Sequence, residues 1–177
     1  MQYVTLASRC ALGIIFVTAL AGKLRNRQAF RAFRDSVQDM MSLPSHWATA
    51  ASTAVVLAEA SIVALLSIEH TVPAGFSLTG AVLLVFSVGL VRVIRSGAPI
   101  PCRCFGASAV PISGRDLLRN AILLATVAAG LTSRLLAPAG GTRPAGVTIG
   151  LACAGLVALT IIFFEDLADL WQHQGGY

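Results

Sequence analysis

Charged residues are scarce in this sequence. Only 12% of its 177 residues are Asp, Glu, Lys or Arg, whereas soluble globular domains carry about 25%. Aromatic residues are few, at 7%, and four cysteines are too few for a disulfide-dense secreted domain. These shortages argue against a water-soluble monomer, and against nucleic-acid binding, which uses basic residues interleaved with exposed aromatics. Because 56% of the residues are apolar, the composition predicts a small integral membrane protein.

Five long apolar runs predict an all-α membrane protein with five transmembrane helices. A helix that crosses a hydrocarbon core of about 30 Å needs about 20 mostly apolar residues. The predicted spans are residues 4–22, 47–68, 72–91, 117–136 and 145–164. They leave only short connections, so we expect a single membrane domain over residues 1–177, with any chemistry in the helices or in the loops beside them.

The thirteen Lys and Arg residues are distributed unevenly between the connections. Ten of them lie in or beside the first and third connections: Lys23, Arg25, Arg27, Arg31, Arg34, Arg92, Arg95, Arg103, Arg115 and Arg119. Cytoplasmic loops are enriched in cations, so we expect a multi-pass protein of the cell membrane with its N-terminus outside. A signal peptide cleaved after residues 19–21 is the alternative, but the cations follow the first apolar run instead of preceding it.

The first connection contains a helical pattern of apolar residues. Phe30, Phe33, Val37 and Met40 are spaced by three, four and three residues, which is typical of an amphipathic helix. Such a helix would either lie on the inner leaflet or pack beneath the bundle, and the sequence leaves both placements open.

The third connection carries the cysteine pair Cys102 and Cys104. Two cysteines with one residue between them span a Cα separation near the upper limit for a disulfide, so their bridge is strained and exchanges readily. Arg103 between them, with Arg115 and Arg119 near the next helix, favours the thiolate, which is the attacking species. We therefore predict that Cys102 and Cys104 are the catalytic residues of thiol–disulfide exchange.

Two other interpretations of this pair remain open. In one, the two cysteines stand in the loop by coincidence and have no function. In the other, they bind zinc. A structural zinc site needs four ligands, and this side of the membrane adds only His46 and His173. We therefore expect no metal.

Three further residues inside the spans are functional candidates. Cys10 and Cys153 lie at similar depths near the opposite face and would form a second thiol pair, or each is a small apolar filler. Glu59 lies near the middle of the second span, where a carboxylate must pair with a cation such as Lys23 or Arg9, bond to small residues of a neighbouring helix, or act as a proton acceptor.

The sequence resembles the methylamine utilisation protein MauE family, which is related to DoxX-like membrane proteins. The resemblance rests on Phe16, Gly22-Lys23-Leu24, Phe30, Leu43-Pro44, Glu59, Cys102-x-Cys104-Phe105-Gly106, Arg115, Leu118 and Arg119-Asn120. It covers roughly residues 12–131, and its most specific part is the Cys-x-Cys-Phe-Gly motif followed by Arg-Asn. One departure is Arg103, because such proteins commonly carry Gly between the two cysteines.

The resemblance implies a DoxX-like four-helix bundle with one additional C-terminal helix. It also implies a role in disulfide chemistry during maturation of exported proteins, beside a thioredoxin-like partner. Phe105, Gly106 and Asn120 would support the cysteines. Disulfides of exported proteins form outside, whereas the cation count places the cysteines inside, so the direction of electron flow stays open.

Two rival functions accompany this interpretation. One is a quinone-linked thiol oxidase, for which quinone would be the cofactor and an aromatic pocket would be needed near the cysteines. The other is a non-enzymatic assembly factor whose Cys102–Cys104 disulfide is only structural. We find no interrupted helix pair of the kind seen in transporters and no phosphate-binding glycine loop after a strand.

Overall fold

The computed structural model describes residues 2–97, 112–136 and 155. The helices are α1 (Gln2–Leu24), α2 (Arg27–Met41), α3 (Ser45–Ser67), the 3-10 turn η1 (Glu69–Thr71), α4 (Val72–Ser96) and α5 (Gly114–Leu136). The described residues contain no strand, which confirms the predicted all-α class. The predicted span at residues 145–164 lies outside the described residues.

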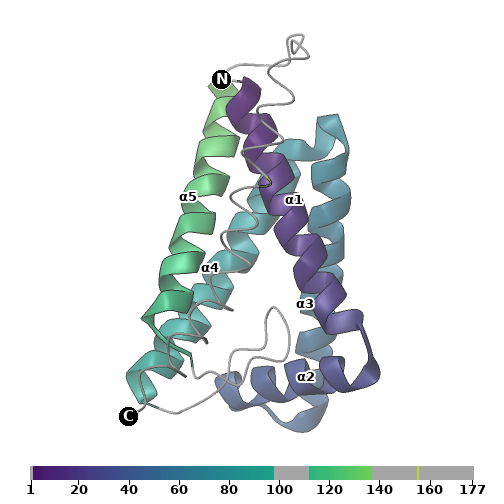
Figure 1. Cartoon of the computed structure of the whole chain (residues 1–177). Helices are drawn as coiled ribbons and strands as arrows, with labels where there is room; N and C mark the ends of the chain where they lie inside the picture. Colours follow the sequence, from purple (N-terminus) through teal and green to yellow (C-terminus); the bar gives the residue numbers. More distant parts are fainter. Residues whose placement is uncertain (1, 98–111, 137–154, 156–177) are drawn as a thin grey trace, which may run out of the picture.

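Four long helices form a bundle in which each packs against two others. Helix α1 contacts α3 and α5, and α4 contacts the same two helices, as Figure 1 shows. The buried core includes Leu12, Ile62, Phe76, Leu123 and Val127, so all four helices contribute to it. This arrangement agrees with the four-helix bundle implied by the resemblance.

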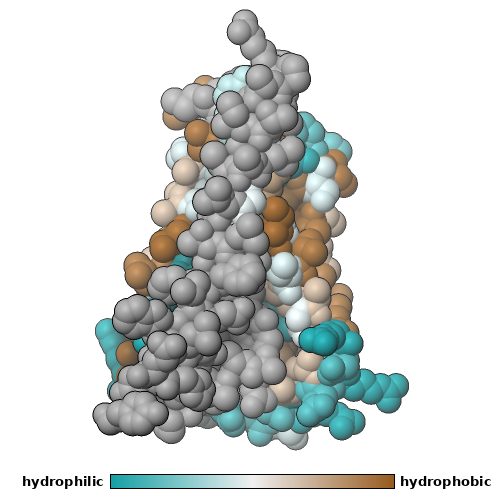
Figure 2. Space-filling model, in the orientation of Figure 1, coloured by the Kyte–Doolittle hydropathy of each residue, from teal (hydrophilic) through white to brown (hydrophobic). Residues whose placement is uncertain are grey.

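Three segments are long and apolar enough to cross a membrane: Tyr3–Leu24, Ser45–Ser67 and Glu69–Ser96. They correspond to the first three predicted spans and support a membrane protein. Figure 2 shows hydrophobic residues over the middle of the visible face and hydrophilic residues gathered at its lower end. Helix α5 has 23 residues but is less apolar, because its first turns carry Arg115, Asp116, Arg119 and Asn120; its predicted membrane crossing stays a prediction.

Local caps determine where the helices begin and end. The Asn26 side chain accepts a hydrogen bond from Ala29 N at 2.7 Å and caps α2. The Asp116 carboxylate accepts one from Ser113 N at 2.9 Å and holds the start of α5. Helix α4 ends at Ser96 and is capped by Gly97, whose φ of 67° lies in the left-handed region that glycine adopts without strain.

Helix α2 crosses the lower end of the bundle (Figure 1). Its apolar stripe faces the other helices, because Phe33 and Val37 are 2% and 4% exposed. The Nζ atom of Lys23 lies 4.9 Å from the centre of the Phe33 ring, within the range of a cation–π interaction. Of the two placements that the sequence left open, the structure therefore supports packing beneath the bundle.

Candidate functional site

The predicted catalytic cysteines fall outside the described residues. These are Cys102 and Cys104, together with Arg103, Phe105, Gly106 and the second-pair candidate Cys153. Helix α4 ends and helix α5 begins at the same end of the bundle (Figure 1). The two described ends between which Cys102 and Cys104 stand in the sequence, Gly97 and Ile112, therefore lie at that end.

A buried ion pair joins α1 to α3. Lys23 Nζ donates to Glu59 Oε1 at 2.6 Å, and the two side chains are 2% and 7% exposed. The sequence offered Lys23 and Arg9 as partners of Glu59. The structure selects Lys23, whereas Arg9 pairs with Glu69 at the opposite end of the bundle.

The second carboxylate oxygen of Glu59 has no hydrogen-bond partner among the described residues. Glu59 lines a small cavity that leaves about 40 Å³ for the centres of water molecules. A cavity that holds a water molecule needs roughly 10–15 Å³, so this cavity has room for water. A buried carboxylate oxygen that lacks a protein partner is most simply satisfied by such a water.

Arg119 and Asn120 line the same cavity from α5, and both are buried. Asn120 Nδ2 donates to Leu83 O at 3.1 Å and to Ser87 Oγ at 2.9 Å, which ties α5 to α4. The structure therefore brings together four of the predicted residues from three helices. We call Lys23, Glu59, Arg119 and Asn120 the polar cluster.

The walls of the cavity are apolar. They are formed by Ile15, Phe16, Ala19, Val82, Leu83, Phe86 and Leu123. Among the residues around the polar cluster, sequence reasoning missed Leu83, Phe86 and Ser87. The span that contains them has no charged residue, so nothing in it marked a site. The one available signal was the four-residue spacing of Leu83 and Ser87, which places them on one helix face.

The polar cluster combines two cationic side chains with one carboxylate. Electrostatic interactions are stronger in the low dielectric of a bundle than in water, so the charges of this cluster act strongly on one another. Arg115, another predicted site residue, is exposed in the first turn of α5 and does not line the cavity.

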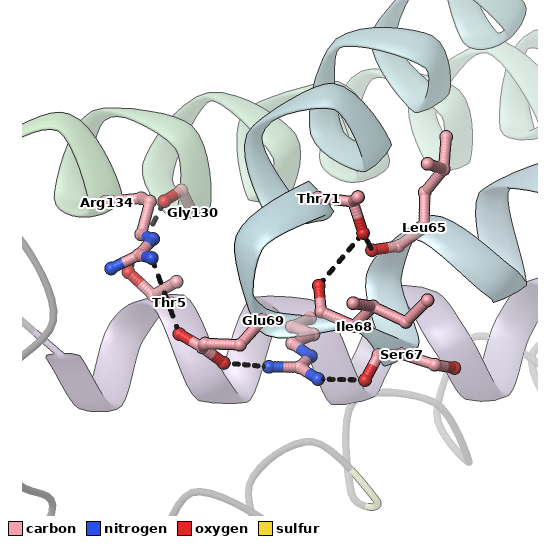
Figure 3. A network of polar contacts seen from close by, with 9 residues as sticks. Thr5, Leu65, Ser67, Ile68, Glu69, Thr71, Gly130 and Arg134 are labelled. Atoms are coloured by element: carbon pink, nitrogen blue, oxygen red, sulfur yellow. Dashed lines mark hydrogen bonds and ion pairs between the residues drawn. The ribbon is translucent and has the colours of Figure 1, made fainter.

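A second ionic network closes the opposite end of the bundle. Glu69 of η1 pairs with Arg9 of α1 at 2.5 Å and with Arg134 of α5 at 3.6 Å, and Figure 3 shows Glu69 reaching toward α5 and α1. Arg9 also donates to Ser67 O at 2.6 Å. The Glu69 side chain is 63% exposed, so this network lies at the surface.

Cys10 lies near this second network, one residue after Arg9. It is half-buried and lines an open groove between α1 and α3, and it forms no disulfide with a described residue. In the described part of the chain, no group of three or more His, Cys, Asp or Glu side chains is arranged to hold a metal ion. His46, considered above as a zinc ligand, packs beside the Trp47 ring.

Comparison with known proteins finds a match to one family model. The model is described as methylamine utilisation protein MauE, and it matches residues 1–133. Neither a search of curated proteins nor a search of solved structures gives a match.

Proposed function

Since the chain belongs to the methylamine utilisation protein MauE family, we propose that it is a membrane thiol–disulfide redox protein that acts through Cys102 and Cys104. The family name links the chain to methylamine utilisation. In the finer proposal, the cysteine pair exchanges electrons with a thioredoxin-like partner during maturation of exported proteins.

The observation that carries this proposal is the polar cluster. Lys23 and Arg119 place two cationic side chains at one cavity, and Lys23 pairs there with the Glu59 carboxylate. The cavity lies toward the end of the bundle at which α4 ends and α5 begins. Cys102 and Cys104 stand between these two helices in the sequence. Cations near a thiol favour its thiolate form, which is the nucleophile in disulfide exchange.

The exchange conserves electrons and protons. A thiolate of the pair attacks the partner's disulfide, a mixed disulfide forms, and one partner sulfur leaves as a thiolate. The second cysteine then attacks the mixed disulfide, which yields the Cys102–Cys104 disulfide and a reduced partner. Two electrons pass to the partner, and two protons move from the cysteine pair to the two departing partner sulfurs; the reverse sequence reduces the cysteine pair.

Glu59 is the proton acceptor in this proposal. Its Oε1 accepts from Lys23, its Oε2 has no partner among the described residues, and the residue lines the small cavity. A proton released when a thiol ionises would reach this oxygen through water.

The cavity does not fit a quinone ring. Ligand pockets usually measure about 300–1,000 Å³, whereas this cavity measures about 40 Å³. We therefore derive no step through quinone.

Trapping of a mixed disulfide tests the proposal. The full chain in lipid nanodiscs is incubated with an oxidised thioredoxin-like protein whose second cysteine has been replaced by serine and whose remaining cysteine carries an aromatic thiol leaving group. We expect a stable adduct with Cys102→Ser or Cys104→Ser, whichever retains the attacking thiol, and none with the double variant.

Cys10→Ser added to the single variant that forms the adduct is the matched control, and it should leave the rate of adduct formation unchanged. If the double variant forms the adduct as fast as that single variant, or if no variant forms it, the redox proposal is wrong. The second of these results would favour an assembly factor with a structural disulfide.

A further inference from the structure

The turn from α1 into α2 forms an open groove of about 290 Å³. It is lined by Leu24, Asn26, Arg27, Phe30 and Arg31, and we call these residues the α1–α2 corner. Because Tyr3–Leu24 is a candidate membrane span that ends here, the corner lies where that span meets the aqueous phase.

The charge of the corner is positive and uncompensated. Arg27 and Arg31 are exposed, are four residues apart on α2, and form no ion pair with any described residue. The first turn of α2 contains no acidic residue. The nearest acidic residue along α2, Asp35, pairs instead with Arg34 at 2.7 Å.

An apolar stripe leads away from the corner along α1. Ile14, Val17, Ala21 and Leu24 are all exposed and are spaced by three, four and three residues, so they lie on one side of the helix. Ile14 and Val17 also line the open groove between α1 and α3. From Leu24 to Ile14 the helix rises about 15 Å, which matches about half of a 30 Å hydrocarbon core.

We propose that the α1–α2 corner binds an anionic phospholipid. The phosphate lies between Arg27 and Arg31, whose guanidinium groups suit phosphate oxygens, and one acyl chain follows the stripe from Leu24 to Ile14. A basic cluster beside a membrane helix attracts anionic lipid, and the continuous apolar stripe specifies a lipid over a free phosphate. This site is independent of the cysteine chemistry.

Native mass spectrometry of the full chain in detergent tests the proposal. The probes are phosphatidylglycerol and phosphatidylcholine with identical acyl chains, added in separate titrations. We expect one phosphatidylglycerol to remain bound at lipid concentrations at which phosphatidylcholine does not. Arg27→Gln/Arg31→Gln should weaken phosphatidylglycerol binding about 30-fold, as expected for two basic residues at an anionic surface.

Arg92→Gln/Arg95→Gln is the matched control, because it removes two exposed cations from the end of α4. The two double variants therefore have the same net charge. It should change binding less than about twofold. Arg27→Lys/Arg31→Lys keeps the charge but loses the planar guanidinium, and it should give intermediate binding.

Three results would overturn the proposal. The first is equal binding of the two lipids, and the second is an equal loss in the two Gln variants, which would indicate attraction by net charge alone. The third is displacement of phosphatidylglycerol by glycerol phosphate at equal concentration, which would indicate a free-phosphate site without a role for the apolar stripe.

Discussion

Lys23 Nζ and Glu59 Oε1 lie 2.6 Å apart inside the bundle, although 36 positions separate the two residues in the chain. The same ammonium group lies over the Phe33 ring of α2. One side chain from the last turn of α1 therefore links α3 and α2, and it fixes where the amphipathic helix lies beneath the bundle.

Breaking this pair should destabilise the protein strongly. Lys23→Met leaves the Glu59 carboxylate buried without its partner, and loss of one member of a buried pair costs about 3–5 kcal/mol. The double variant Lys23→Met/Glu59→Gln should be more stable than Lys23→Met, because no buried charge is left uncompensated. Unfolding in mixed micelles, read by circular dichroism, measures the free energy for a double-mutant cycle. Additive effects of the two substitutions would contradict a direct interaction.

Arg119 should raise the reactivity of the cysteine pair if the proposed function is correct. Arg119→Gln removes a buried cation, and a charge several ångströms away contributes about 1–2 kcal/mol at an intermediate dielectric. We expect alkylation of Cys102 and Cys104 by iodoacetamide to slow about tenfold, a factor that corresponds to about 1.4 kcal/mol. Cys10→Ser and Cys153→Ser are present in all samples so that these two thiols do not contribute.

The control for Arg119 is Arg134→Gln, which removes an arginine from the other end of the same helix. It should leave the alkylation rate unchanged. If the alkylation rate is the same with Arg119→Gln as with Arg119 in place, the polar cluster does not affect the reactivity of the thiols.

Gly130 should not tolerate a larger residue. A Cβ atom at this position would lie 2.5 Å from Phe76 Cζ and 2.9 Å from Ser8 Cβ, because α5 approaches α4 and α1 closely there. Gly130→Ala should therefore lower stability by about 1–3 kcal/mol, as overpacked cores do. Thermal unfolding in detergent measures the loss.

Gly80→Ala provides the matched control for Gly130. Its new Cβ would lie 3.6 Å from Val127 Cγ1, which is an ordinary contact, and alanine has the higher helix propensity. Stability equal to or slightly above that of the wild type is expected. A loss of stability as large as that of Gly130→Ala would indicate that replacing any helix glycine destabilises the protein, and that the close helix contact at Gly130 is not the cause.

The network around Glu69 should contribute little to stability. Glu69→Gln removes the ion pairs with Arg9 and Arg134, but the Glu69 side chain is mostly exposed. Surface pairs contribute about 0–1 kcal/mol and weaken with salt. The free energy of unfolding should fall by less than about 1 kcal/mol, with a smaller difference at high ionic strength. A loss comparable to that of Lys23→Met would mean that the network is shielded from water.

The helices and their ends could be predicted from the sequence because their signals are local. Apolar runs with at most one charge determined α1, α3 and α4 within a few residues, and α4 extends five residues beyond its predicted end, to Ser96. The spacing of Phe33 and Val37 predicted an amphipathic α2. The isolated charge of Glu59 in an apolar span identified it as a site residue before any partner was known.

The tertiary structure alone decided which residues meet. Glu59 had two candidate cations, and the crossing of α1 and α3 brought it to Lys23 while Arg9 met Glu69. Asn120 bonds to α4 through Leu83 O and Ser87 Oγ, a pairing that no local pattern predicts. Periodicity determines which face of a helix is apolar, but contacts between residues more than 30 positions apart depend on how the whole helices pack.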